Sequence, residues 1–124
     1  MNREFISTSE FERRWNKLGL GDKEQRNLEK MLLENPKVGA VIPGTGSARK
    51  IRVEYAGKGK RGGARVIYVD LLVYEKVFFI TAYAKGEQEN ISETDKKAIA
   101  NFIEYLKDEL EQKRRSEKHG KRKK

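Results

Sequence analysis

Residues 49–65 constrain the fold of this chain most, because they combine strand periodicity, glycine and dense positive charge. Apolar and charged residues alternate over positions 50–55, which is the period-2 pattern of a strand with one buried face. Four glycines follow and allow a sharp change of direction, after which residues 66–69 form a second apolar run. We therefore predict a β-hairpin that carries cations on both strands and on its tip.

The charge of this hairpin stands out against the rest of the chain. It holds seven basic residues and one acid, Glu54, a net of +6 within 17 residues. The whole chain carries +9, but residues 113–124 alone carry +7, so residues 1–112 net only +2. A body polarised in this way attracts an anionic partner to one place on its surface. The basic residues of the hairpin are Arg49, Lys50, Arg52, Lys58, Lys60, Arg61 and Arg65.

Helical patterns precede and follow the hairpin. Ser7 and Glu10 have the spacing of a capping box, followed by a short apolar stripe, and a second helix is predicted from about Asp22 to the residue before Pro36. Together they predict an N-terminal helical hairpin. A C-terminal helix is predicted after Ser92, with an apolar stripe at Ile99, Phe102, Ile103, Leu106 and Leu110.

Two further segments have strand character. Residues 5–6 predict a short edge strand, and residues 77–83 are apolar on both faces at their start, which indicates a central or helix-covered strand. The fold class that follows is α+β: a small antiparallel sheet flanked by the helical hairpin and the C-terminal helix. One domain is expected over residues 1–112.

Residues 113–124 form a basic tail without an apolar residue to bury, so we expect it to be disordered or a frayed helix. It either attracts RNA nonspecifically or is simply a solvated extension.

Composition argues against several classes of function. The chain has no cysteine, and its one histidine, His119, lies in the tail, so a zinc site or a histidine acid–base pair is not expected. We expect no metal and no cofactor. Gly44-Thr45-Gly46 lacks the flanking residues of a phosphate-binding loop and is better read as a close-packed turn. No signal peptide or membrane span is evident, so a soluble cytoplasmic protein is expected.

The sequence resembles the RelE/HigB toxins of type II toxin–antitoxin systems, from Phe5 to about Leu110. The joint pattern is specific, although no single part of it is. The resemblance rests on Asn35-Pro36-x-x-Gly39-x-Val41-Ile42-x-Gly44-Thr45-Gly46, Arg49-Lys50-Ile51-Arg52-Val53, Gly57-Lys58-Gly59-Lys60-Arg61-Gly62-Gly63-x-Arg65-Val66-Ile67-Tyr68 and Tyr83-x-Lys85-x-Glu87.

This resemblance implies a fold close to that of microbial ribonucleases and an endoribonuclease, an mRNA interferase, that cleaves mRNA on the ribosome without a metal. It also implies neutralisation by a cognate antitoxin, for which we expect a helix-turn-helix protein. The catalytic residues that it implies are Lys50, Arg52, Arg65 and Lys85. Some relatives carry a tyrosine or histidine after the last motif, where this chain reads residues 88–92 without either, and Tyr83 is the candidate to replace it.

The chemistry of these residue types fits RNA cleavage. The 2′-OH must lose a proton and attack its own phosphate, and the added negative charge must be held. Arginine stays charged and binds phosphate through two N–H groups, while cations around Lys50 oppose its protonation and would let it serve as acid or base. Contacts to the RNA backbone or the ribosome are assigned to Arg49, Lys58, Lys60 and Arg61.

Two other functions use the same features. A noncatalytic RNA- or ribosome-binding module would need only the basic hairpin, and a gyrase inhibitor of the ParE type would share the fold but act on DNA supercoiling. The full set of basic strand and loop residues favours the ribonuclease.

Overall fold

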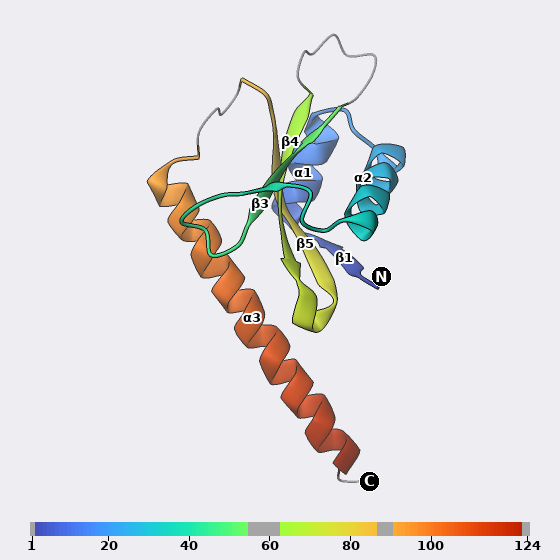
Figure 1. Ribbon diagram of the computed structural model, residues 1–124, viewed down its shortest axis with the longest axis vertical. Helices are drawn as coiled ribbons and strands as arrows, with labels where there is room; N and C mark the ends of the chain where they lie inside the picture. Colours follow the sequence, from blue (N-terminus) through green and yellow to red (C-terminus); the bar gives the residue numbers. More distant parts are fainter. Residues whose placement is uncertain (1, 55–62, 87–90, 123–124) are drawn as a thin grey trace.

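A five-stranded sheet organises the structure, a computed structural model that describes residues 2–54, 63–86 and 91–122 (Figure 1). The strand order across the sheet is β1-β5-β4-β3-β2, so the last strand of the chain lies beside the first. The strands are β1 (Glu4–Ser7), β2 (Ala40–Val41), β3 (Arg49–Val53), β4 (Ala64–Leu71) and β5 (Lys76–Ala84).

The sheet is antiparallel from β2 to β5, as predicted, but β1 runs parallel to β5. A parallel pair needs a long crossover between its strands, and the chain from α1 to β4 supplies it. The edge strand expected at residues 5–6 is β1, and the helix-covered strand expected at residues 77–83 is β5.

Helices cover both faces of the sheet (Figure 1). The predicted helical hairpin is α1 (Ser9–Lys17) and α2 (Asp22–Glu34), which pack on one face, and the predicted C-terminal helix is α3 (Glu93–Arg122), which packs on the other. The core under α1 and α2 includes Phe11, Trp15, Leu28, Leu32, Val66, Tyr68 and Phe79. The core under α3 includes Ile67, Val69, Ile80, Ile99, Ile103 and Leu106.

The first helix begins one residue later than its capping signature predicted. Ser7 is still part of β1 and pairs with Phe79, so Thr8 is the first residue free to cap the helix. The Thr8 hydroxyl accepts a hydrogen bond from the Phe11 N–H at 3.0 Å. It also donates to the Ile80 carbonyl at 2.8 Å, which ties the start of α1 to β5. The expected cap at the other helix is confirmed, with the Ser92 hydroxyl accepting from the Asp95 N–H at 3.1 Å.

Strand β5 contains one extra residue relative to β4. Ile67 pairs with Thr81 and Tyr68 pairs with Phe79, so Ile80 has no partner on β4. A bulge of this kind re-aims the side chains beyond it. It lets Ile80 pack under α3 while Phe79 and Ala82 pack on the opposite face.

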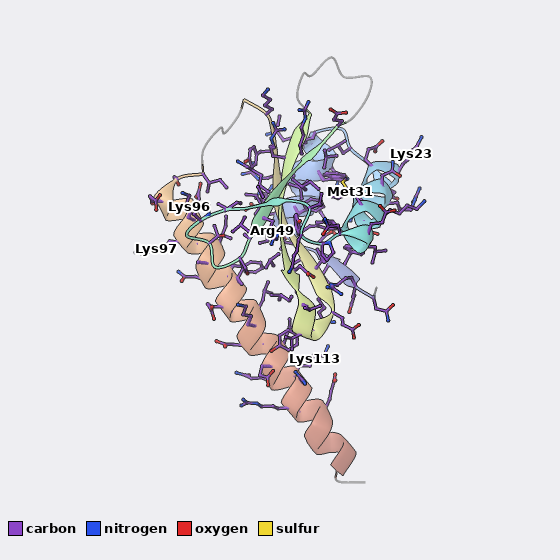
Figure 2. All side chains as sticks on the ribbon, viewed as in Figure 1. Lys23, Met31, Arg49, Lys96, Lys97 and Lys113 are labelled. Atoms are coloured by element: carbon purple, nitrogen blue, oxygen red, sulfur yellow. The ribbon has the colours of Figure 1, made fainter. Side chains whose placement is uncertain are left out.

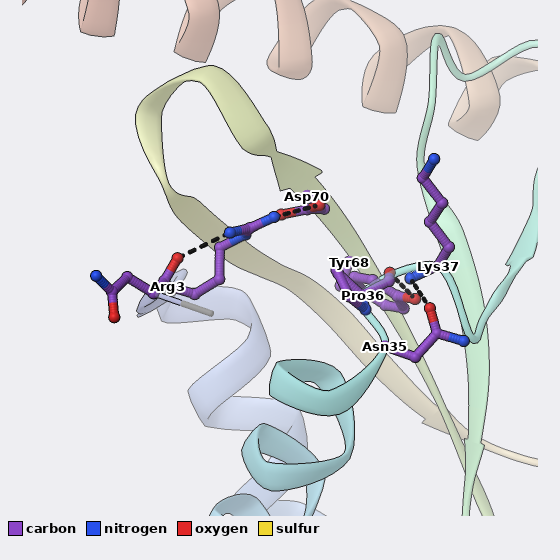
Figure 3. Close-up of polar contacts among 7 residues, drawn as sticks. Arg3, Asn35, Pro36, Lys37, Tyr68 and Asp70 are labelled. Atoms are coloured by element: carbon purple, nitrogen blue, oxygen red, sulfur yellow. Dashed lines mark hydrogen bonds and ion pairs between the residues drawn. The ribbon is translucent and has the colours of Figure 1, made fainter.

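Tyr68 fastens the loop that leads into β2 and β3 (Figure 3). Its buried hydroxyl donates to the Pro36 carbonyl at 2.8 Å, as Figure 3 shows. The same hydroxyl accepts from the Gly39 N–H at 3.0 Å. A Cβ atom at Gly39 would lie 2.8 Å from the Tyr68 ring, so only glycine fits this close approach. Burial raises the pKa of Tyr68, which keeps the hydroxyl protonated and able to donate.

An ion pair fixes the start of the chain to the far end of β4. Arg3 Nε lies 2.6 Å from Asp70 Oδ1, and its Nη2 lies 3.2 Å from Asp70 Oδ2 (Figure 3). The side chains are only 4% and 12% exposed, so this two-point contact is shielded from solvent. The hydrogen bond to Asp70 raises the pKa of Arg3.

Helix α3 continues well past the body of the protein (Figure 1). Of the two expectations for the basic tail, disorder and helix, the structure shows helix through Arg122. The Tyr74 hydroxyl donates to Glu111 Oε2 at 2.7 Å where the helix leaves the body. This bond lowers the pKa of Glu111 and raises that of Tyr74. Among the described residues, no helix is both long enough and apolar enough to span a membrane.

Replacing Tyr68 by phenylalanine tests the anchoring of the loop. The change leaves the buried Pro36 carbonyl and Gly39 N–H without this partner, so we expect the free energy of unfolding to fall by about 1–3 kcal/mol. Chemical denaturation measures the loss. The exposed Tyr105→Phe change is the control and should cost less than about 0.5 kcal/mol. Equal stability of the two variants would contradict the anchoring role.

Candidate active site

The strand register places four predicted site residues on the sheet face that α3 covers. Ile51 and Val53 of β3 are buried in the core under α1 and α2. Side chains alternate along a strand, so Lys50 and Arg52 point to the opposite face. Arg65 lies between Ala64 and Val66, which belong to the same core, and therefore points to the α3 side as well. We call Lys50, Arg52, Arg65 and Lys85 the cationic face.

Three of the predicted residues stand in one row across three strands. Arg52 pairs with Arg65 on the neighbouring strand, and Arg65 pairs with Tyr83 on the next. Side chains at directly opposed positions have Cβ atoms about 5 Å apart. The row thus places two arginines at directly opposed positions, an arrangement that favours the binding of one anion by both.

The two lysines flank this row. Lys50 pairs with Ile67, one pleat away from Arg52 on the same face of β3. The Lys85 N–H donates to the Gly63 carbonyl at 3.1 Å, which continues the ladder of β4 and β5 beyond its last assigned pair. Alternation from Tyr83 then places Lys85 on the side of the cationic face. The side chain of Lys85 is exposed and that of Lys50 half-buried.

Arg49 lies apart from the other cations. It pairs with Tyr68, on the face covered by α1 and α2, and donates to the carbonyls of Lys37 at 3.1 Å and Gly39 at 2.7 Å. These bonds hold the same loop that Tyr68 anchors. The structure therefore gives Arg49 a structural task and does not bring it to the cationic face. The remaining predicted contacts, Lys58, Lys60 and Arg61, lie outside the described residues.

Figure 2 shows this separation of the two sides. The labelled Lys23 and Met31 lie on α2, whereas Lys96 and Lys97 lie at the start of α3, across the sheet.

Arg52 has a nearby carboxylate, Glu54, at 3.2 Å, but both side chains are more than half exposed. Exposed pairs of this kind are weak, so Glu54 does not prevent Arg52 from binding another anion.

Tyr83 occupies a different environment from the one that sequence reasoning gave it. The residue is 4% exposed, and its hydroxyl has no hydrogen-bond partner within the described part of the chain. Burial raises the pKa of Tyr83, and the positive charge of Arg65 partly offsets this rise. A phenol so enclosed does not reach a substrate in this state. It packs beside Arg65 and is placed to position that side chain.

Among the described residues, no three histidine, cysteine, aspartate or glutamate side chains gather closely enough to hold a metal ion. The cationic face offers two arginines, which can bind phosphate oxygens, and two lysines, which can donate or accept a proton.

Sequence reasoning missed the roles of Tyr68 and Thr8. Both are single polar residues whose partners lie far along the chain, at separations of 29 to 72 residues. Asn35-Pro36, Gly39 and Tyr68 all belong to the motifs quoted above, but nothing in the sequence indicated that the tyrosine holds the other positions.

The fold and the cationic face define a small α+β protein with a positively charged surface on its sheet. Among solved structures, the chain is similar to a double arginine-to-alanine mutant of the E. coli toxin RelE in the free state. The TM-score is 0.52 at 22% sequence identity, and the match covers 72% of this chain and 90% of that one. This likeness supports the fold.

The family model for the RelE toxin of the RelE/RelB toxin–antitoxin system matches residues 7–121. The chain therefore belongs to the RelE toxin family, which confirms the resemblance seen in its motifs. Membership of this family implies an antitoxin as partner.

Replacing Tyr83 by phenylalanine provides the counterpart to the Tyr68 experiment. Removing a buried hydroxyl that has no partner should leave the free energy of unfolding unchanged or raise it by up to about 1 kcal/mol. Chemical denaturation of the two phenylalanine variants side by side makes the comparison. A loss as large as that of Tyr68→Phe would show that the Tyr83 hydroxyl is hydrogen-bonded in solution.

Proposed function

We propose that this protein is an endoribonuclease toxin, an mRNA interferase that inhibits translation by cutting mRNA on the ribosome. The observation that carries the proposal is the pairing of Arg52 with Arg65 on adjacent strands, with Lys50 and Lys85 on the same face. Membership of the RelE toxin family supports it.

The proposed reaction is attack of a ribose 2′-oxygen on the neighbouring phosphorus. The new P–O2′ bond forms as the P–O5′ bond breaks, which gives a 2′,3′-cyclic phosphate and a 5′-hydroxyl. One proton leaves the 2′-OH and one reaches the departing 5′-oxygen. Arg52 and Arg65 hold the charge that builds up on the phosphate oxygens, and Lys50 and Lys85 are the candidates for moving the protons.

This chemistry explains why such an enzyme would depend on the ribosome. A site built from cations, without a histidine pair, gains most when another body orients the RNA for in-line attack, because positioning can lower a barrier by several kcal/mol. Tyr83 contributes indirectly by holding Arg65, since its own hydroxyl is buried. The antitoxin, for which we propose a helix-turn-helix protein, would act by covering the cationic face or by blocking entry to the ribosome.

Substituting Arg65 by alanine tests the proposal most directly. Loss of one charge-stabilising group in a preorganised site should reduce the rate of mRNA cleavage by about 100- to 1,000-fold. The measurement is single-turnover cleavage of an mRNA bound to programmed ribosomes, with ribosome binding followed in parallel. Binding that persists without cleavage supports an enzyme. Absence of cleavage by the unsubstituted protein would favour the binding module, and DNA damage without mRNA cleavage on induction would favour the gyrase inhibitor.

Arg49 and Arg52 form a matched pair, three residues apart on one strand but on opposite faces. We expect Arg52→Met to slow cleavage at least tenfold with little change in stability, because its side chain is exposed. Arg49→Met should lower stability, through the lost bonds to the loop, and leave the chemical step of cleavage nearly unchanged. Single-turnover rates and denaturation curves of both variants decide the matter. The reverse outcome would place the active face on the other side of the sheet.

A further inference from the structure

A cleft of about 380 Å³ runs over β5, between the start of α1 and the first turns of α3. Its floor includes Ile67, Thr81 and Tyr83, and its α3 wall includes Ala98 and Phe102. Glu10 and Arg14 line it on the α1 side. The residues of the floor follow directly from the bulge in β5, which turns both Ile80 and Thr81 toward this space.

The cleft lies next to the cationic face. Tyr83 ends the row that begins with Arg52 and Arg65, and it also lines the cleft. Ile67 of the cleft floor pairs with Lys50. Neighbouring strands lie about 5 Å apart, so a phosphate held by Arg65 on β4 would sit one strand away from the cleft over β5.

The lining has the chemistry of a site for a flat, partly polar group. Isoleucine and phenylalanine side chains offer apolar contact, and the Thr81 hydroxyl adds hydrogen-bonding capacity at the floor. Glu10 places a carboxylate in the lining, which disfavours a phosphate there but suits the amino groups of a base. Arg14 also lines the cleft, and its Nε lies 3.7 Å from Glu10 Oε2.

We propose that this cleft binds the nucleobase adjacent to the scissile phosphate and makes the enzyme disfavour uracil at that position. The inference rests on the proposed ribonuclease function. Guanine, adenine and cytosine each present an exocyclic amino group that can donate to Glu10. Uracil has none: its single N3–H donor lies between two carbonyl oxygens, and the Glu10 carboxylate repels these oxygens, so uracil binds there less well.

Ala98 offers a way to fill the cleft without touching the core. It is exposed on α3 and lines the cleft, so Ala98→Trp should block the space while the helix remains packed. Asn101→Trp, also exposed on α3 but outside the cleft lining, is the matched control. Denaturation curves verify that both variants fold.

The readout is the identity of the bases around each cut, obtained by sequencing cleaved transcripts, together with single-turnover rates on programmed ribosomes. We expect Ala98→Trp to slow cleavage at preferred sites at least tenfold and to abolish the base preference at one position, with Asn101→Trp unchanged. Glu10→Gln should specifically reduce the discrimination against uracil. Unchanged base preference and cleavage rate in Ala98→Trp would overturn the proposal. An Ala98→Trp variant that cleaves normally but is no longer neutralised by the antitoxin would also overturn it, because the cleft would then bind the antitoxin and not a base.

A second measurement separates this inference from the ribonuclease proposal. Titration of the unsubstituted protein with guanosine, adenosine, cytidine and uridine monophosphates, followed by NMR, should shift the amide signals of Thr81 and Ala98 with all but uridine monophosphate. Ala98→Trp should lose these shifts. Shifts without any RNA cleavage would keep the base site and remove the nuclease, whereas cleavage without base-dependent shifts or preference would remove the base site alone.

Discussion

The antiparallel register of β3, β4 and β5 is the constraint on which the site depends. Because side chains alternate along a strand, a slip of one residue would move Arg52 and Arg65 into the core under α1 and α2. The apolar residues next to these arginines in the sequence prevent that slip, because Ile51, Val53 and Val66 are buried only in the observed register. The packing that stabilises the sheet therefore also positions its charges.

The two faces of the sheet have different tasks. On the α1 and α2 side, the polar atoms of Arg49 and Tyr68 form hydrogen bonds with the backbone of one loop. These side chains therefore hold the loop in place. On the α3 side, Arg52 is exposed and Arg65 half-buried, next to an enclosed tyrosine. Arg49 thus stabilises the loop, whereas Arg52 is on the face for which we propose substrate binding, because alternate residues of a strand point to opposite faces.

Much of this arrangement follows from local sequence pattern. Alternation of apolar and charged residues identified the hairpin and grouped Lys50 with Arg52, and the same alternation, applied strictly, already sets Arg49 on the other face. The burial of Tyr83, the anchoring by Tyr68 and the cleft over β5 were not predictable. Each depends on contacts between segments that are distant in the sequence. The cleft also depends on the bulge at Ile80, which no residue type in that apolar run indicates.

The extension of α3 beyond Glu111 has a mechanical consequence. A helix rises about 1.5 Å per residue, so residues 112–122 extend the basic tail by roughly 16 Å as a stiff arm. Lys113, Arg114 and Arg115 lie on this arm. The hydrogen bond between Tyr74 and Glu111 fixes the direction in which the arm leaves the body. In the function that we propose, the tail and the cationic face would contact one large polyanion. Because the two regions are joined rigidly, the first contact gives the second a high effective concentration, so each can be weak alone and the pair still selects one docking orientation.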